Sequence, residues 1–238
     1  QSTVILFDPD TGKLKSLVGG NYLTAVRTAA SSAVSIAHLA RKNAKVLGIV
    51  GAGHQSTFQL RAALEQRSFE KVVAWNLHAD KLSNLADVCK ELNVPFEGLS
   101  REALCAQADV IITITSAFEA LIDKAWIKPG THIACMGTDT KGKQEVDAEL
   151  LATASVFTDE LAQSITIGEA QHAIASGLIK DTDIVSIGDV INGVKPGRTS
   201  DDEITLFDGT GVGLQDLAVA SVAAALAEEK GLATYFSL

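Results

Sequence analysis

The feature that most constrains this chain is a regular alternation of short apolar runs with segments that suit helices. Apolar runs of strand length occupy residues 45–50, 71–75, 109–114, 131–136, 155–158 and 184–187. Segments compatible with helices separate them, at residues 55–67, 79–92, 100–107, 145–153 and 167–176. Strands that are apolar throughout are typical of a parallel sheet covered by helices on both faces. The alternation therefore predicts an α/β fold with a Rossmann-type, doubly wound parallel sheet.

The two ends of the chain have a different character from this middle region. Residues 3–7 and 14–18 flank the turn-forming segment "DPDTGK", which predicts a β-hairpin. Residues 21–41 repeat apolar and small residues at helical spacing, and residues 211–229 form a second helix of the same kind. After Ile187 the alternation stops, and a turn-rich connector follows.

We therefore expect two domains. Residues 42–190 are predicted to be a dinucleotide-binding domain. It is inserted into an α+β substrate and dimerisation domain that is built from residues 1–41 and 191–238.

Composition excludes several classes of function. The net charge of −9 over 238 residues argues against binding of nucleic acid, which needs clustered lysine and arginine. No apolar run reaches membrane-spanning length. The five histidines have no metal-binding spacing, so no metal is expected. The odd number of cysteines, without a Cys-x-x-Cys pair, favours buried, reduced thiols in a cytoplasmic protein: Cys89, Cys105 and Cys135.

A glycine-rich turn joins the first strand of the middle region to the helix after it. The sequence "GAGHQS" places Gly51, Gly53 and Ser56 between a strand and a helix, which is the context that a dinucleotide-binding turn needs. Gly51 permits the tight turn, Gly53 lets the backbone approach a pyrophosphate, and Ser56 is small enough for close packing. The free N–H groups of the helix N-terminus attract phosphate.

Two further strand ends carry candidate cofactor residues. Asn76 ends the second strand, where an acid commonly binds the adenosine ribose, and its amide leaves the choice between NAD and NADP open. It is also a plausible turn residue without a selecting role. Thr115 and Ser116 fall where the nicotinamide half of the crevice is expected. Their alternative role is the N-cap of a helix ahead of Glu119.

Three segments, taken with this glycine turn, resemble the ornithine cyclodeaminase/mu-crystallin family. They are "AVRTAA" at 25–30, "MGTDTKGKQEVD" at 136–147 and "PGRTSDDEITLFDGTGVGLQDLA" at 196–218. The similarity covers essentially the whole chain in order. It implies relatives that are longer at the N-terminus, by a segment that completes the substrate domain and carries an arginine and a lysine of the site.

The resemblance assigns roles to single residues. Asp139 matches the catalytic acid, and Arg27 matches an arginine that binds the substrate carboxylate. The cofactor positions are carried over to Gly51, Gly53, His54, Gln55, Asn76, Thr115, Ser116, Gly137 and Thr210. Gly209 and Thr210 stand where many relatives have Ser-Val, so Gly209 offers no side-chain contact. Without the resemblance, the polar segment around Asp139 reads equally well as a surface turn.

The implied chemistry is hydride exchange between NAD or NADP and the Cα of a small amino or imino acid. This describes an imine reductase or an amino-acid dehydrogenase. The alternatives are an ornithine cyclodeaminase-type lyase and a non-catalytic protein that binds NADPH and a small ligand. The small-residue helices and the hairpin are expected to form a homodimer, as relatives do.

Overall fold

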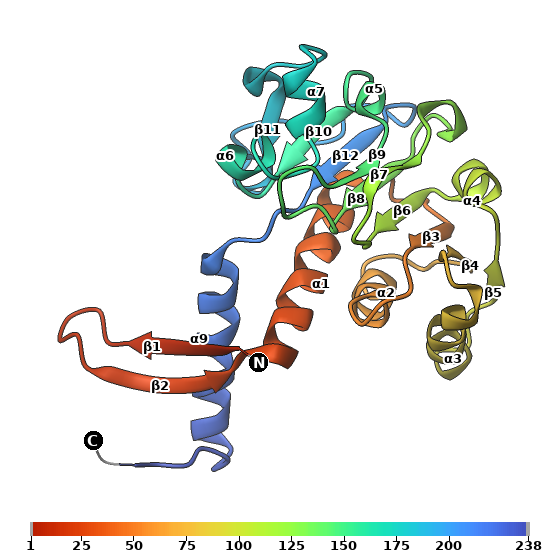
Figure 1. Cartoon of the computed structure of the whole chain (residues 1–238). Coiled ribbons are helices and arrows are strands. Elements are labelled where there is room, and N and C mark those ends of the chain that lie inside the picture. The colour runs from red at the N-terminus through yellow and green to blue at the C-terminus, as the bar shows by residue number, and fades with distance from the viewer. Residues whose placement is uncertain (1, 237–238) are drawn as a thin grey trace. The chain divides into compact units, whose positions relative to one another are not determined.

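The computed structural model describes residues 2–236, and an eight-stranded parallel sheet dominates it (Figure 1). The strand order is β11-β10-β12-β8-β6-β3-β4-β5, and every neighbouring pair is parallel. The strands are β3 (Val46–Val50), β4 (Lys71–Trp75), β5 (Phe96–Gly98), β6 (Val110–Thr113), β8 (His132–Cys135), β10 (Ser155–Thr158), β11 (Ile184–Ser186) and β12 (Thr205–Asp208). The predicted doubly wound parallel sheet is confirmed.

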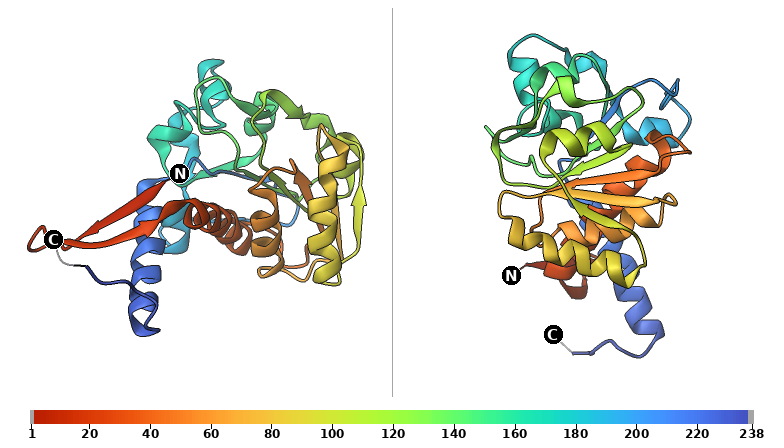
Figure 2. Two further views of the ribbon diagram at one scale, coloured as in Figure 1. Left: turned by 60° about the horizontal axis from the view of Figure 1, so that its bottom comes forward. Right: turned by 90° about the vertical axis from the view of Figure 1, so that its right-hand side faces the viewer.

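Helices cover both faces of this sheet, as the right-hand view of Figure 2 shows. The α-helices of the sheet region are α2 (Ser56–Leu64), α3 (Ser83–Glu91), α4 (Arg101–Gln107), α5 (Ala148–Leu151), α6 (Leu161–Ser164), α7 (Gln171–Ala175) and α8 (Ile187–Ile191). Short 3-10 turns lie at Ala79–Leu82, Lys124–Trp126 and Asp181–Asp183. A second small sheet pairs β7 (Phe118–Ile122) with β9 (Gln144–Val146).

Alternate residues of one strand enter two separate hydrophobic cores. Ile112 of β6 packs in the core that includes Leu60 and Leu85 of α2 and α3. Its neighbour Ile111 packs in the core that includes Leu104 and Leu150 of α4 and α5. Because successive side chains of a strand point to opposite faces, both faces of the sheet are buried. This explains why the strands read as continuous apolar runs.

The sequence predictions are wrong in two places within this region. The alternation does not stop after Ile187, because β12 enters the sheet between β10 and β8. The predicted helix at 145–153 is instead strand β9 followed by the single turn of α5. The short strands β5 and β7 were also not predicted. Each missed strand has three to five residues, which is too short for a clear periodic pattern.

The chain divides into two compact units, of which residues 29–211 form the larger. The smaller unit combines residues 2–28 with residues 212–236 of the described chain. It contains the predicted hairpin, β1 (Thr3–Phe7) with β2 (Leu14–Gly19), and the helix α9 (Gly213–Glu229). Helix α1 (Gly20–Leu39) crosses the boundary between the units. The domain functions assigned to the chain ends stay predictions.

A small hydrophobic core holds the smaller unit together. Leu6 of β1, Leu23 of α1 and Ala220 of α9 are buried against one another. Within residues 2–236, no helix has the length and apolar character needed to cross a membrane.

Candidate functional site

All strands of the large sheet are parallel, so their carboxyl ends meet at one edge. The chain order reverses between β3 and β6, because β4 and β5 lie on one side of β3 while β6 and β8 lie on the other. Ligands of open α/β sheets bind at such a switch point, beyond the carboxyl ends of the strands. The predicted cofactor residues follow β3, β4, β6, β8 and β12, and therefore share this edge.

Gly51 begins the turn after β3 in a conformation that favours glycine. Its φ is +110°, and a Cβ atom there would lie 2.5 Å from the carbonyl oxygen of Ile114. The amide of Gly51 donates to the carbonyl of Trp75 at 2.8 Å. The turn after β3 is therefore packed against the chain that leaves β6, and only a residue without a side chain fits there.

The rest of the turn has the free donors and the open space that a pyrophosphate needs. A Cβ atom on Gly53 would meet nothing within 4 Å. Among the described residues, no hydrogen bond uses the backbone amides of Gly53, His54 or Gln55. The side-chain oxygen Oε1 of Gln55 is buried and has no partner in the part of the chain that the structure describes. The backbone amides of Gly53, His54 and Gln55, together with the N-terminus of α2, fit a dinucleotide phosphate, whereas Gln55 Oε1 can only accept a hydrogen bond.

The side chains of His54 and Ser56, in the same turn, make contacts within the protein. His54 is exposed, and its ring centroid lies 5.4 Å from that of Phe58. Ser56 is fully buried, and its hydroxyl donates to the carbonyl of Gly53 at 2.7 Å. Ser56 therefore fixes the first turn of α2 from inside, which agrees with the close packing expected of a small residue at that position.

Asn76 uses both ends of its side-chain amide within the protein. Its Oδ1 accepts a hydrogen bond from the amide of Ala52 at 2.9 Å, and its Nδ2 donates to the carbonyl of His78 at 2.8 Å. The side chain thus links the exit of β4 to the glycine turn. Of the two roles considered from the sequence, this geometry favours holding the turn in place, while Oδ1 keeps a second lone pair for a ribose hydroxyl.

The exit of β6 is fixed by Glu145, a residue that sequence reasoning missed. Thr115 donates to Glu145 Oε1 from its amide at 2.6 Å and from its hydroxyl at 2.7 Å. Thr113 donates its hydroxyl, and Gly137 its amide, to Glu145 Oε2 at 2.6 and 2.9 Å. A Cβ atom on Gly137 would collide with both Thr115 and Glu145. The alternative role of Thr115 and Ser116 as a helix N-cap is wrong, because strand β7 follows them.

A second buried acid, Glu169, lies directly behind Glu145. Its Oε1 accepts from the amides of Glu145 and Val146 at 2.9 and 2.8 Å, and its Oε2 is paired with the hydroxyl of Thr138. Both carboxyl groups are shielded from solvent. Burial raises the pKa of Glu145, and burial together with the neighbouring Glu145 charge raises the pKa of Glu169 to about 8.

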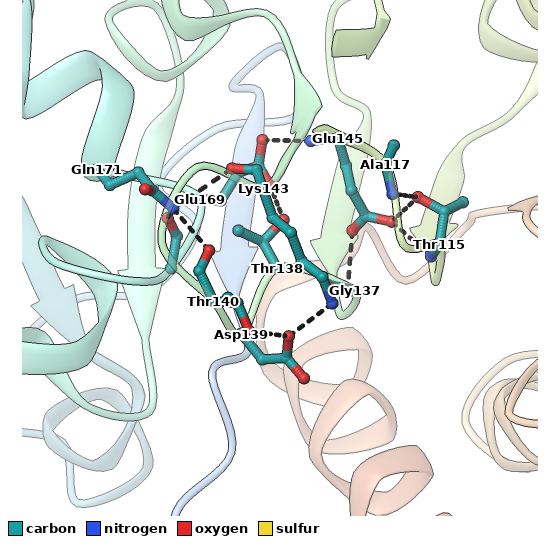
Figure 3. Close-up of polar contacts among 11 residues, drawn as sticks. Thr115, Ala117, Gly137, Thr138, Asp139, Thr140, Lys143, Glu145, Glu169 and Gln171 are labelled. Atoms are coloured by element: carbon teal, nitrogen blue, oxygen red, sulfur yellow. Dashed lines mark hydrogen bonds and ion pairs between the residues drawn. The ribbon is translucent and has the colours of Figure 1, made fainter. Parts of the chain in front are cut away.

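Asp139 stands at the exposed end of this network, as Figure 3 shows. It follows β8, and its side chain is 61% exposed. Lys143 reaches back four residues and donates to Asp139 Oδ1 at 2.7 Å. The same ammonium donates to the carbonyl of Gly137 at 3.2 Å, and the Lys143 side chain is only 16% exposed. The Asp139 carboxylate is therefore exposed to solvent at the carboxyl edge of the sheet, and the mostly buried Lys143 side chain holds it in place.

Thr210 is hydrogen-bonded to Asp159, which follows β10. Asp159 Oδ1 accepts from the amide and the hydroxyl of Thr210 at 3.0 and 2.8 Å, and Asp159 Oδ2 accepts from the amide of Gly211 at 2.9 Å. A Cβ atom on Gly209 would lie 2.5 Å from the sulfur of Met136, so a larger residue there needs the Met136 side chain to move. The Thr210 hydroxyl thus holds the exit of β12.

Arg27 belongs to the smaller unit and lies in α1. Its Nε is 3.2 Å from Asp216 Oδ1, and its Nη1 donates to Gln215 Oε1 at 3.4 Å. The Arg27 side chain is mostly buried, with 18% of its surface exposed. Asp216, which sequence reasoning also missed, is therefore the partner of Arg27 within the smaller unit. Within residues 2–236, no three His, Cys, Asp or Glu side chains are grouped to hold a metal ion.

The model of one protein family matches nearly the entire chain. The ornithine cyclodeaminase/mu-crystallin family model matches residues 1–231. The chain belongs to this family. The resemblance inferred from "AVRTAA", "MGTDTKGKQEVD" and the segment at 196–218 is therefore confirmed.

Individual members of the family are similar to this chain over almost its whole length. The chain is 60% identical over 233 residues to the iminosuccinate reductase of Paracoccus denitrificans, which covers 98% of this chain and 72% of the relative. A crystal structure of that reductase in complex with NAD+ matches 99% of this chain and 73% of its own, with a TM-score of 0.97 and 58% identity. An archaeal alanine dehydrogenase dimer with bound NAD matches 99% of this chain and 74% of its own, with a TM-score of 0.96 and 34% identity.

The similarity to these enzymes confirms the class of reaction that was predicted from the sequence. The chain is an NAD(P)-dependent oxidoreductase that exchanges hydride with the Cα of an amino or imino acid. The prediction of a nicotinamide cofactor, either NAD or NADP, is also confirmed.

Proposed function

We propose that this chain reduces iminosuccinate with NADH and so forms aspartate. The observation that carries the proposal is the 60% identity, over 98% of the chain, to an iminosuccinate reductase. The bound nicotinamide supplies the hydride that is added to the imine carbon. The residues of this chain have three tasks beside it: to hold the dinucleotide, to hold the substrate nitrogen, and to orient the α-carboxylate.

Asp139 is the residue proposed for the substrate nitrogen. An exposed carboxylate at the carboxyl edge of the sheet, 2.7 Å from Lys143 Nζ, can accept a charge-assisted hydrogen bond from an iminium N–H. This contact stabilises the positive charge that makes the imine carbon reactive towards hydride. The same carboxylate can exchange a proton with the nitrogen before and after reduction.

Arg27 is proposed to bind the α-carboxylate of the substrate. A guanidinium offers two parallel N–H donors to a carboxylate, which fixes the direction of Cα. Asp216, 3.2 Å from Arg27 Nε, limits the directions in which the guanidinium can point. Arg27 therefore acts on substrate binding and orientation rather than on proton transfer.

The proposed cofactor is NAD rather than NADP. Support comes from the NAD complexes of two relatives and from Asn76, whose amide is used by Ala52 and His78 and offers no positive charge to a 2′-phosphate. The unpaired amides of Gly53, His54 and Gln55 are the proposed pyrophosphate donors.

We also propose a homodimer that works in the cytoplasm. The likeness to an alanine dehydrogenase dimer supports the assembly, as do exposed apolar side chains on the smaller unit: Ile5, Phe7, Leu17, Leu217, Val222 and Leu226. The three cysteines are free and buried, which supports a reducing compartment. Sedimentation equilibrium tests the dimer, and a monomer at high protein concentration would contradict it.

The test of function is a steady-state assay of NADH oxidation. Iminosuccinate forms in solution from oxaloacetate and ammonium, and the matched controls are pyruvate with ammonium and the cyclic imine Δ1-pyrroline-2-carboxylate. We expect the highest kcat/KM with iminosuccinate. A higher kcat/KM with either control would assign another imine. Release of ammonia from ornithine would identify a cyclodeaminase, and NADH binding without turnover of any of these compounds would identify a binding protein.

A further inference from the structure

The two buried carboxyl groups behind the Asp139 loop carry an inference of their own. We propose that Glu145 and Glu169 are positioning residues, of which one is ionised and the other protonated. In this state they hold the strand exits next to Asp139 in the arrangement that catalysis needs. The proposal rests on the proposed function only where activity is the readout. It concerns how the loop is held and not which imine is reduced.

The hydrogen bonds of the two acids reach the exits of two strands, β6 and β8, at the carboxyl edge of the sheet. Glu145 holds Thr115 after β6 and the amide of Gly137 after β8. Glu169 holds the hydroxyl of Thr138 and the backbone of β9. Asp139 is the next residue after Thr138, so the position of its carboxylate depends on both acids. Neither Glu145 nor Glu169 reaches solvent, and neither is placed to touch a substrate.

The partners of each carboxyl group decide where the proton lies. Glu145 faces four donors, of which two are backbone amides that can only donate, so it accepts all four best as a carboxylate. Glu169 Oε1 also faces two amides, but Glu169 Oε2 faces only the Thr138 hydroxyl. A hydroxyl can accept as well as donate. The proton therefore lies on Glu169 Oε2 and points to Thr138 Oγ1.

The surroundings do not offer a counter-ion for a second charge. Among the described residues, no lysine, arginine or histidine donates to either carboxyl group. Lys143 approaches from the loop but donates to Gly137 O and Asp139, and His172 of α7 faces the carbonyl of Lys143. The other neighbours are acidic groups: Cys135 of β8, whose thiol pKa burial and the nearby acids raise well above its usual range, and Asp208 of β12, whose pKa burial raises to about 7.

This arrangement predicts a loss of geometry in alkaline solution. Burial and the Glu145 charge raise the pKa of Glu169 to about 8, so Glu169 keeps its proton at neutral pH and loses it above that range. Two like charges in one dry site repel each other, while the Thr138 hydroxyl can turn to donate to the ionised Glu169. The repulsion displaces the strand exits that the two acids hold, and with them the loop that carries Asp139, so turnover falls.

The test compares two isosteric variants across pH. Glu169→Gln keeps an acceptor for the two amides and a donor for Thr138, so it mimics the protonated state. We expect its kcat at pH 7 to lie within about twofold of wild type and to lack the alkaline decline near pH 8 that wild type shows. Glu145→Gln turns an NH2 group towards two donors. We expect it to lose roughly tenfold or more in kcat at every pH, with the affinity for NADH largely kept.

An infrared measurement tests the same proton without any turnover. The carbonyl band of a protonated carboxyl group should disappear between pH 7 and pH 9.5 in wild type. Glu169→Gln should lack the Glu169 part of this band, and Glu169→Gln combined with Asp208→Asn should lack the band at both pH values, because Asp208, whose pKa burial raises to about 7, keeps part of its own proton at pH 7. A Glu169→Gln enzyme as impaired as Glu145→Gln would overturn the proposal, and so would a wild-type protein whose band matches that of Glu169→Gln. If no imine is reduced by wild type, the infrared result still decides the proton, and only the proposed function fails.

Discussion

Lys143 Nζ lies 2.7 Å from Asp139 Oδ1 and 3.2 Å from the carbonyl oxygen of Gly137, so one ammonium group holds both the carboxylate and the backbone of the loop. The stem of Lys143 is mostly buried while the Asp139 side chain is exposed. The pair therefore differs from a surface ion pair between two freely moving side chains, because one partner is already fixed.

The first prediction concerns Asp139. Asp139→Asn keeps the shape of the side chain but removes its charge and its capacity to exchange a proton. We expect kcat to fall by roughly a hundredfold or more, the usual effect of losing general acid–base assistance, with the Kd for NADH nearly unchanged. Stopped-flow turnover and calorimetric binding measure the two quantities. An Asp139→Asn protein with wild-type turnover would reduce the segment 137–147 to a surface loop.

The second prediction concerns Lys143. Lys143→Met leaves Asp139 without its partner, and we expect kcat/KM to fall several-fold. The free energy of unfolding should fall by about 1–2 kcal/mol, because the variant loses the hydrogen bond to the Gly137 carbonyl, while the ion pair with an exposed carboxylate contributes little. Lys141→Met is the matched control, since Lys141 lies exposed in the same loop and makes no ion pair among the described residues. Equal losses in both variants would show that loop charge, and not the Asp139 contact, matters.

The third prediction separates the two glycines of the cofactor turn. Gly53→Val should leave the melting temperature unchanged but abolish NADH binding, because its Cβ meets no protein atom and would occupy the space that the pyrophosphate needs. Gly51→Val should instead destabilise the fold by about 1–3 kcal/mol or more, because φ is +110° and the Ile114 carbonyl blocks a side chain. Differential scanning fluorimetry with and without NADH distinguishes the two effects. Unchanged NADH affinity in Gly53→Val would remove the pyrophosphate from this turn.

The fourth prediction concerns the buried imidazole of His132, which lies 3.1 Å from Ser35 Oγ and 3.0 Å from Thr205 Oγ1. Burial, and then the charges of Arg198 and Arg67, lower the pKa of His132 to about 3. Between pH 6.5 and pH 3 the unfolded chain binds a proton there that the native protein does not. The contribution of His132 to stability is therefore complete above pH 6.5 and is lost as the pH falls.

His132→Gln isolates this contribution. The difference in the free energy of unfolding between wild type and His132→Gln should shrink by about 1.4 kcal/mol for each pH unit below 6.5. Glu169 and Asp208, whose raised pKa values act in the opposite direction, are present in both proteins and cancel in the comparison. Urea denaturation at pH 7.5, 5.5 and 4.5 measures the difference. A difference that stays constant over this range would mean that His132 is protonated in the native state.

The sheet and the glycine turn could be predicted because each depends on local sequence. An apolar run such as 109–114 predicts a strand that is buried on both faces. The turn at Gly51 is predicted from the strand before it and the helix after it. The position of Asp139 at the end of β8 follows from the same pattern. Its role came from the resemblance and not from the pattern.

The buried acids could not be predicted, because their surroundings come from distant parts of the chain. Glu145 looks like one more polar residue in "KGKQEVD", and its burial depends on Thr113, Thr115 and Gly137. Glu169 lies 24 residues further along the chain from Glu145, with no periodic signal that joins the two. The two acids meet only in the folded chain, where the amides of Glu145 and Val146 in β9 donate to Glu169 Oε1.

The position of β12 decides which part of this protein can fold as a unit. Thr205–Asp208 is the last strand of the sheet in sequence, yet it lies between β10 and β8. A fragment that ends at residue 190 would leave two pieces, β11-β10 and β8-β6-β3-β4-β5, each with a hydrophobic, unpaired edge where β12 belongs. Cooperative folding of the cofactor-binding half must therefore wait until residue 208 has been synthesised, and a truncated product is a candidate for aggregation rather than a minimal enzyme.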